Sequence, residues 1–332
     1  MKLRSALLLF SLLAGAADAQ EPKVPIQSET TLHSQSNLVL VPTLVKDAKG
    51  RALYGLQAKD FVIEDDGIEQ KVRLDEAAES QPVSLVIAIQ RGRRASYEFS
   101  RMHGLSSMLE PLFGQEQTEV ALVEFDSTVE LVRDFTRDSS SIAEDLKQLK
   151  WGDRGAAILD AVYYSEKLLE KTSKERQRVL LLISETREHG SVWAKKIDDV
   201  VSLLGKSNTV VYTLAFSPSI SNVLDTMRGN NINEMNATPD LMAPLIMTAQ
   251  AMRKNTSKAI ASMTGGECEW FKTRKGFENL MNDFDNHLHS RYLLSFEPKD
   301  PKLGLHQLRV RLKDRGTGEV LARASYWAQG TP

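Results

Sequence analysis

The chain has 332 residues, enough for about two domains at ~150 residues per domain. Apolar residues make up 42% and charged residues 26%, close to the average of folded soluble proteins, which excludes a disordered, collagen-like or polytopic membrane chain. Lys and Arg total 42 against 44 for Asp and Glu, so the strong basic excess typical of nucleic-acid-binding proteins is missing. The one cysteine, Cys268, excludes an intramolecular disulfide and a thiolate metal cluster.

Residues 1–19 have the pattern of a secretory signal peptide. Lys2 and Arg4 precede a short apolar run, and Ala17-Asp18-Ala19 fits the small-x-small cleavage pattern. The run is shorter than the ~20 residues that a membrane-spanning helix needs, and no later stretch is long enough. We therefore expect an exported protein, periplasmic or secreted after cleavage near Ala19, with no membrane span in the mature chain. Residues 20–36 are polar and predict a flexible tail.

Residues 37–80 predict a small antiparallel β unit. Strand patterns cover residues 38–45, 61–64 and 70–74. Asp66-Gly67 between the last two is a strong signal for a two-residue hairpin turn. Because so small a unit is not stable alone, we expect it to pair with strands from elsewhere in the chain.

Residues 82–290 predict an α/β domain with a doubly wound, mostly parallel sheet. Continuous apolar runs suit central parallel strands that are buried on both faces. These runs cover residues 84–89, 120–125, 179–183 and 210–216. Helical patterns alternate with them and follow them, at residues 139–149, 158–169, 192–204, 241–252, 258–263 and 277–289.

Residues 291–328 return to strand patterns, at 292–296, 306–313 and 320–326. We expect these strands to pair with the N-terminal β unit. The two ends of the chain would then form one small β-sandwich, and the α/β domain would be an insertion between them.

Ligands of open parallel sheets bind beyond the carboxyl ends of the strands, so the loops at that edge are where we look for a site. The first loop covers residues 90–96, the second residues 151–157 and the third residues 184–191.

Several short motifs resemble the von Willebrand factor type A (VWA) domain, and more narrowly the secreted VWFA-related family described from Acidobacteria. The motifs are spread over most of the chain: Lys46-Asp47-Ala48-Lys49-Gly50, the run from Leu56 to Asp66-Gly67, Val123-Glu124-Phe125-Asp126, Asp134-Phe135-Thr136, Leu159-Asp160-Ala161, Thr264-Gly265-Gly266 and Tyr292-Leu293-Leu294-Ser295-Phe296-Glu297-Pro298. The resemblance implies a VWA-like fold and a protein-binding task.

The resemblance also implies a Mg²⁺ site, built in the family from a D-x-S-x-S motif, a threonine and an aspartate, all of which offer oxygen ligands. This sequence departs from the family at each of these positions. It has Gln90, Gly92 and Arg94 in place of the D-x-S-x-S residues, Ala156 in place of the threonine and Glu185 in place of the aspartate. We therefore expect a degenerate site with no metal ion, and no other cofactor.

An arginine could replace the missing positive charge. Arg94 is our candidate to pair with Glu185, since a guanidinium binds carboxylates well. The cluster could also accept a partner's carboxylate or a phosphate at a helix N-terminus. The alternative is that these arginines only project into solvent. The candidate ligand-binding residues are Gln90, Arg91, Gly92, Arg93, Arg94, Asp153, Ala156 and Glu185.

Three functions remain open from the sequence. The first is an exported, non-enzymatic protein-interaction module with a protein partner that binds through an acidic group. The second is a metal-dependent adhesion protein with non-standard ligands. The third is a hydrolase, for which His189 beside Ser191 is a weak candidate pair.

Two further groups of residues are expected to carry no chemistry. Asp283, Asp285, His287 and His289 fall as i,i+4 pairs on an exposed helix end and not as a metal site. Cys268 has acidic neighbours, which disfavour a reactive thiolate.

Overall fold

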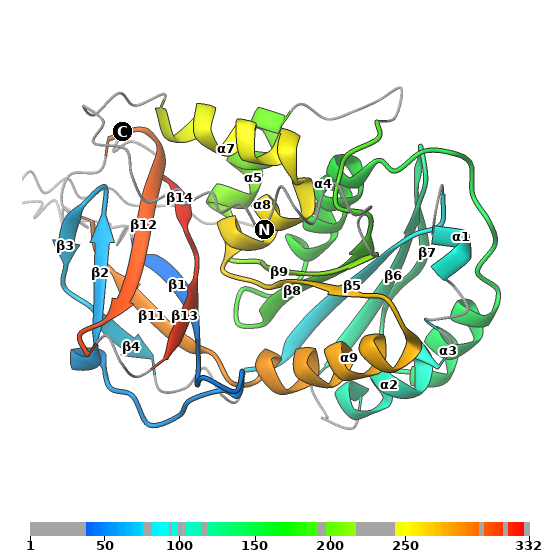
Figure 1. Cartoon of the computed structure of the whole chain (residues 1–332), viewed down its shortest axis with the longest axis horizontal. Helices are drawn as coiled ribbons and strands as arrows, with labels where there is room; N and C mark the ends of the chain where they lie inside the picture. Colours follow the sequence, from blue (N-terminus) through cyan, green and yellow to red (C-terminus); the bar gives the residue numbers. More distant parts are fainter. Residues whose placement is uncertain are drawn as a thin grey trace, which may run out of the picture. The chain divides into compact units, whose positions relative to one another are not determined.

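A six-stranded sheet is the framework of the α/β part, with strand order β10-β9-β8-β5-β6-β7 (Figure 1). The strands are β5 (Val83–Gln90), β6 (Glu119–Phe125), β7 (Val129–Thr136), β8 (Gln177–Ser184), β9 (Val210–Phe216) and β10 (Cys268–Phe271). Neighbouring strands pair in parallel except β6 and β7. The four predicted apolar runs are confirmed as β5, β6, β8 and β9, and every residue of β5 and β9 is buried.

The computed structural model describes residues 38–75, 81–92, 95–98, 102, 104–113, 118–190, 197–216, 243–298, 302–314 and 318–328. All of them fall within one unit, Asn37–Pro332. The predicted signal peptide and tail, and the loop residues Arg93 and Arg94, lie outside the described residues.

Helices cover both faces of this sheet, as a doubly wound fold requires (Figure 1). Alternate side chains of β5 point to opposite faces: Leu85 and Ile87 join one apolar cluster, and Val86 and Ala88 join the other. The first cluster is covered by α2 (Leu105–Phe113), α3 (Ser139–Lys147) and α9 (Arg274–Leu288). The second is covered by α4 (Ile158–Leu169), α5 (Ile197–Lys206), α7 (Ala243–Lys254) and α8 (Thr256–Thr264). A short helix, α1 (Ala95–Glu98), follows β5. None of the helices in the described residues is long and apolar enough to cross a membrane.

Two antiparallel sheets are built from both ends of the chain, as predicted, with orders β13-β1-β11-β4 and β14-β12-β2-β3. Their strands are β1 (Val39–Lys46), β2 (Phe61–Asp65), β3 (Ile68–Gln70), β4 (Arg73–Asp75), β11 (Tyr292–Phe296), β12 (Gly304–Leu312), β13 (Glu319–Ala322) and β14 (Ser325–Ala328), and the 3-10 turn η1 (Ala58–Asp60) precedes β2. Side chains of both sheets share one apolar core, among them Val41, Ile63, Phe296 and Tyr326. The predicted hairpin at Asp66-Gly67 is confirmed, since both residues have positive φ, as a primed turn requires.

Two strand boundaries differ from the prediction. Residues 320–326 are not one strand, because β13 pairs with β1 and β14 pairs with β12 in the other sheet. The break falls at Arg323, which is buried and donates hydrogen bonds to the carbonyl groups of Leu204 and Gly205 at the end of α5. Residues 70–74 are likewise divided between β3 and β4, which belong to different sheets.

A buried ion-pair cluster joins β1 to the α/β part. Lys46 Nζ lies 3.0 Å from Glu267 Oε1, and His287 Nδ1 lies 2.8 Å from Glu267 Oε2. Although burial alone would raise the pKa of Glu267, His287 and Lys46 lower it to about 2. The prediction of an exposed helix end was therefore wrong for His287, which is 6% exposed and whose Nε2 lies 3.2 Å from the Gly50 carbonyl oxygen.

Candidate functional site

Four loops meet at the carboxyl edge of the sheet, around the point where the strand order reverses. β5 lies between β8 and β6, so the loops after these three strands are neighbours. The Arg91 amide donates to the Phe125 carbonyl at 2.8 Å, and the Arg91 carbonyl accepts from the Gly152 amide at 3.0 Å. The topology thus brings the first and second predicted loops together, and adds the loop after β6.

Gln90 and Glu185 form the centre of this face. The Glu185 amide donates to Gln90 Oε1 at 2.8 Å, while Gln90 Nε2 donates to Glu185 Oε1 at 3.0 Å and to the Gly92 carbonyl at 3.1 Å. Gln90 is fully buried. Its side-chain amide therefore joins the first loop to the third in the position where the family has a ligand carboxylate.

The second contact of Glu185 is a histidine. His189 Nε2 lies 3.6 Å from Glu185 Oε2, and the main chain of His189 pairs with that of Ala156. The predicted partner Arg94 lies outside the described residues, so the Arg94–Glu185 pair stays a prediction. Ser191 also lies outside them, and the same holds for the His189–Ser191 pair.

Arg91 points to the β6 and β7 side of the face and contacts three carboxylates. Its guanidinium lies 2.9 Å from Asp126, 3.3 Å from Glu124 and 3.3 Å from Glu130. Although burial opposes the charged form of Arg91, these carboxylates raise its pKa. Burial raises the pKa of Glu124, with Arg91 opposing the shift. This arginine is therefore balanced by carboxylates of its own chain.

Asp153 fastens the second loop to the loop after β6. Its carboxylate accepts hydrogen bonds from the amides of Ser127 at 3.0 Å and Gly155 at 2.7 Å, and also bonds the Ser127 hydroxyl. Glycine is needed at Gly155 because a Cβ atom there would lie 2.3 Å from the Ser127 nitrogen. A Cβ atom on Gly92 would lie 2.3 Å from the Gly155 carbonyl oxygen. The serine of the family motif therefore does not fit at residue 92 without movement of the loop.

Glu188 is a residue of this face that sequence reasoning missed. Its Oε2 accepts the Leu159 amide at 2.7 Å at the start of α4, while its Oε1 is buried without a hydrogen-bond partner. Burial raises the pKa of Glu188 to about 7, and Asp160 adds to the shift. The available signal was indirect: Ala157 precedes α4 and offers no side-chain cap, so the helix needs an acceptor from elsewhere.

The donor set of this face does not fit a divalent cation as arranged. Mg²⁺ takes oxygen ligands at ~2.1 Å in octahedral geometry. Ala156 offers no side-chain oxygen, and Gln90 directs its NH₂ group at the carboxylate that would be a ligand. Both oxygens of Glu185 already face nitrogen atoms of this chain.

A second group of possible metal ligands lies at the terminal sheets. Among the described residues, Asp65, Asp66 and His306 bring their ligand atoms within 4.8 Å of one another. His306 Nδ1 lies 2.9 Å from Asp66 Oδ2 and Nε2 lies 2.6 Å from the Lys302 carbonyl oxygen. Asp65 and Asp66 raise the pKa of His306 to about 10. A protonated imidazole thus supplies the positive charge at this position.

Cys268 is a free thiol with its side chain largely buried. Burial, together with Glu269, raises its pKa to about 12. The thiol therefore stays protonated at neutral pH, in agreement with the expectation of an unreactive cysteine.

The family comparison agrees with this geometry. Residues 90–187 match the family model described as the von Willebrand factor type A domain. They run from the last residue of β5 into the third loop, which follows β8. The chain therefore contains a VWA domain, with the mostly parallel sheet expected of that fold and two small antiparallel sheets from the terminal segments. A search of curated protein sequences gave no match.

Solved structures similar to this chain include three with low sequence identity. BatB from Bacteroides thetaiotaomicron is 12% identical, with 62% of this chain and 98% of that chain covered and a TM-score of 0.40. The vWF domain of the type V pili tip protein Mfa5 from Porphyromonas gingivalis is 10% identical, with 62% and 93% covered and a TM-score of 0.41. Proximal thread matrix protein 1 from the mussel byssus is 12% identical, with 73% and 50% covered and a TM-score of 0.44.

Proposed function

We propose that this chain is an exported, non-enzymatic protein-binding module of the secreted VWFA-related type, whose VWA domain binds its partner without a metal ion. The observation that carries the proposal is the pair of hydrogen bonds between Gln90 and Glu185. The Gln90 amide stands where the family has a ligand carboxylate and bonds Glu185 and the Gly92 carbonyl, so hydrogen bonds within the chain join the first and third loops, which supports binding without a cation. The secretory pattern of residues 1–19 supports export.

The partner is proposed to present an acidic group to the first loop. Arg91 is balanced by three carboxylates of its own chain, so we assign the contact to Arg93 and Arg94, which follow it in the sequence. Guanidinium groups at such a loop would recognise a carboxylate by paired hydrogen bonds.

A metal titration separates this proposal from metal-dependent adhesion. Mg²⁺ and Mn²⁺ are titrated into the protein by calorimetry, with Glu185→Ala as the paired variant. We expect no saturable heat with either protein. Binding of one metal ion per chain that disappears in Glu185→Ala would overturn the metal-free proposal and favour an adhesion protein with non-standard ligands.

Partner capture tests the rest of the proposal. Purified protein is crosslinked in envelope extract of the native host, with and without EDTA. We expect a defined partner band that persists in EDTA and is lost in the double variant Arg93→Glu, Arg94→Glu. The double variant Lys49→Glu, Lys59→Glu changes the same charge at two exposed positions, in the turn after β1 and in η1, and should keep the band. Loss of the band in the control as well would show that net charge, and not the loop, governs capture.

A further inference from the structure

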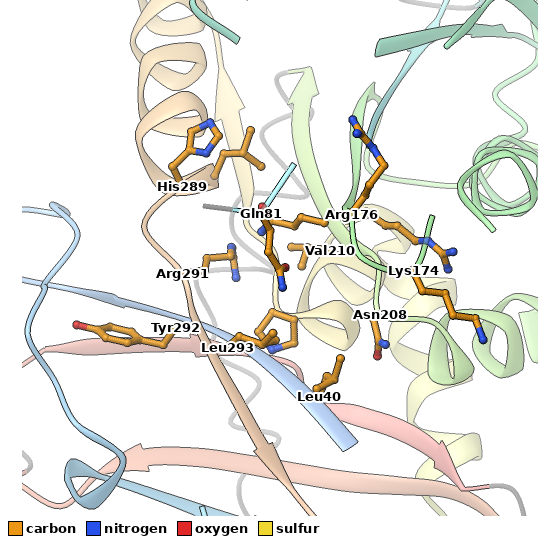
Figure 2. A pocket seen from close by; sticks show the side chains of 14 residues that line it. Leu40, Gln81, Lys174, Arg176, Asn208, Val210, His289, Arg291, Tyr292 and Leu293 are labelled. Carbon is orange, nitrogen blue, oxygen red and sulfur yellow. The ribbon is translucent and has the colours of Figure 1, made fainter. Parts of the chain in front are cut away.

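The cavity beside β11 is lined by an arginine that is bonded within the chain. It has a volume of about 90 Å³, and Figure 2 shows Arg291 among the side chains that line it. Arg291 donates to the Tyr212 hydroxyl at 2.6 Å and to the Gly265 carbonyl at 2.6 Å. A group of side chains in the terminal sheets differs from this cavity, because its possible metal ligands face one another.

This group, the Asp–Asp–His cluster, consists of Asp65, Asp66 and His306. Asp65 ends β2, Asp66 follows it in the hairpin turn with positive φ, and His306 belongs to β12. β12 pairs with β2, and Figure 1 shows β3, β2 and β12 side by side. One ligand atom of each residue lies within 4.8 Å of the other two. Residues from both ends of the chain therefore contribute to one cluster.

The separations in the cluster are those of neighbouring ligands of one metal ion. His306 Nδ1 lies 2.9 Å from Asp66 Oδ2 and 3.4 Å from Asp65 Oδ1. Ligands at ~2.1 Å from a shared ion are about 3.0 Å apart in octahedral geometry and about 3.4 Å apart in tetrahedral geometry. Both observed distances therefore fit ligands of a shared ion.

The second oxygen of each carboxylate is held by another group. Asp65 Oδ2 accepts a hydrogen bond from the Tyr326 hydroxyl at 2.9 Å. Asp66 Oδ1 accepts one from the Gln307 amide at 2.9 Å. Contacts of this kind orient the carboxylates of metal sites. Each aspartate is thus fixed through one oxygen and presents the other to His306.

His306 presents its Nδ1 atom to the cluster. Nε2 lies 2.6 Å from the Lys302 carbonyl oxygen, and because a carbonyl oxygen can only accept, Nε2 carries a hydrogen. The ring also stacks on Tyr326, with the ring centroids 4.9 Å apart. A histidine that ligates a metal usually donates its other N–H to a carbonyl or carboxylate in this way. Nδ1 is therefore the nitrogen available to a metal ion.

Hydrogen bonds do not complete the cluster. Within the part of the chain that the structure describes, His306 Nδ1 and Asp65 Oδ1 are buried without a hydrogen-bond partner, although Asp66 Oδ2 is close to Nδ1. An N–H group prefers an acceptor nearly in line with its bond. A neighbouring ligand of an octahedral ion instead lies about 45° off the metal–nitrogen bond. A short separation without an aligned hydrogen bond is the arrangement expected of ligands that share an ion.

Charge and exposure also suit a cation. Two carboxylates balance the charge of one divalent ion once the ion has displaced the proton from Nδ1. The side chains of Asp65 and His306 are 9% and 6% exposed, whereas that of Asp66 is 46% exposed. An ion would therefore enter from the side of Asp66. Imidazole together with carboxylate ligands suits Zn²⁺ and similar transition-metal ions.

We propose that Asp65, Asp66 and His306 bind one divalent transition-metal ion, with Zn²⁺ as the representative ion. The ion would join the β2–β3 hairpin to β12, so that it links the N-terminal and C-terminal parts of the terminal sheets. This site is separate from the loops at the carboxyl edge of the α/β sheet, and it neither requires nor replaces a metal ion there.

The test is calorimetric titration of Zn²⁺ into the untagged chain after EDTA treatment and desalting. It is done at pH 8, where the proton on Nδ1 competes less than at lower pH. Zn²⁺ is the probe because it binds such ligands more tightly than Mn²⁺, so the Mg²⁺ and Mn²⁺ titration above is not expected to fill this site. Thermal unfolding with Zn²⁺ and then with EDTA is the second readout, since an ion that binds the folded chain raises its stability.

The variants are Asp66→Asn and His306→Gln. Asparagine tolerates the positive φ of residue 66 and keeps an oxygen for the Gln307 amide. Glu69→Gln is the matched control, since Glu69 is an exposed carboxylate of the same hairpin outside the cluster. We expect one Zn²⁺ per chain, with affinity at least about tenfold weaker in both variants and unchanged in Glu69→Gln. Glu185→Ala should also bind Zn²⁺ like the wild type.

Four results would overturn the proposal. They are the lack of saturable Zn²⁺ binding to the wild type, unchanged affinity in folded Asp66→Asn, equal weakening in Glu69→Gln, and binding that is lost in Glu185→Ala. The last result would place the ion at the carboxyl edge of the α/β sheet. Circular dichroism shows whether each variant is folded, and either variant alone carries the test. A crystal grown with Zn²⁺ that shows no anomalous peak beside Asp65, Asp66 and His306 would overturn it as well.

Discussion

Replacing Glu188 by glutamine is expected to change how the stability of the protein depends on pH. Burial raises the pKa of Glu188 from 4.5 to about 7. The folded protein then keeps a proton that the unfolded chain loses in this window, so the stabilisation is present below pH 4.5 and is lost as the pH rises through 7. Glutamine keeps an oxygen acceptor for the Leu159 amide and does not titrate.

The size of this change in the free energy of unfolding follows from the pH interval between the unfolded and folded pKa values of Glu188. Each pH unit in which the folded state holds one extra proton costs about 1.4 kcal/mol, so the interval from 4.5 to about 7 gives about 3 kcal/mol as an upper value. Partial access of water to Glu188 reduces this to about 2 kcal/mol. The wild-type free energy of unfolding should fall by that amount relative to Glu188→Gln between pH 5 and pH 8.

Urea unfolding at pH 5, 6, 7 and 8 measures the difference between the two proteins. Taking the difference cancels the titration of the histidines, which both proteins share. The variant Glu175→Gln is the control for removal of one exposed carboxylate. A Glu188→Gln difference that stays constant within about 0.5 kcal/mol across this range would refute the reasoning.

Three further predictions test packing and charge. Gly155→Ala should lower the free energy of unfolding by at least about 2 kcal/mol, because its Cβ would overlap backbone atoms, while Gly190→Ala, with open space around it, should change it by less than about 0.5 kcal/mol in the same thermal melts. His306→Gln should lower the free energy of unfolding by about 1–2 kcal/mol at pH 6, after allowance for solvent, and by less at pH 10. The reason is that a pKa raised from 6.5 to about 10 gives a stabilisation that is full below pH 6.5 and is lost as the pH rises through 10. Urea unfolding at both pH values checks this. Arg323→Met should cost about 2–4 kcal/mol in denaturant unfolding, because the carbonyl groups at the end of α5 lose their donor, and Arg323→Lys should recover less than half of the loss.

The central strands could be predicted because burial on both faces leaves a continuous apolar pattern. The edge strands could not be predicted in this way. β7 is antiparallel and mostly half-exposed, so its pattern is mixed, and β10 has only four residues, including Glu269. Their place in the sheet depends on neighbours that are distant in sequence.

The split of residues 320–326 had no local signal. Their apolar character suits a strand, and the break depends on Arg323 reaching the end of α5, more than a hundred residues earlier in the chain. Hydrogen bonds of this kind become visible only when the fold brings both groups together.

The position of the candidate site was predictable, but its partners were not. Parallel strands place their carboxyl ends at one edge, so the first loop, after β5, and the third loop, after β8, had to be neighbours. Which charges pair there depends on side-chain direction: Arg91 turns toward Asp126 and Glu124, and Glu185 faces Gln90. Sequence spacing alone does not distinguish these arrangements.

The pairing of β1 with β11 and β13 sets an order for folding. Val41 lies opposite Leu294, so these strands cannot meet until nearly the whole chain has been synthesised. The α/β part lies between them, and its strands pair with one another, so it can form before the ends close. When the α/β part folds, residue 83 at the start of β5 and residue 288 at the end of α9 become parts of one folded domain. The chain that must still be closed to pair the terminal strands is then effectively shorter. Until that closure, β1 has no partner strand and β2 is paired only with β3, so their open edges expose the newly made chain to aggregation.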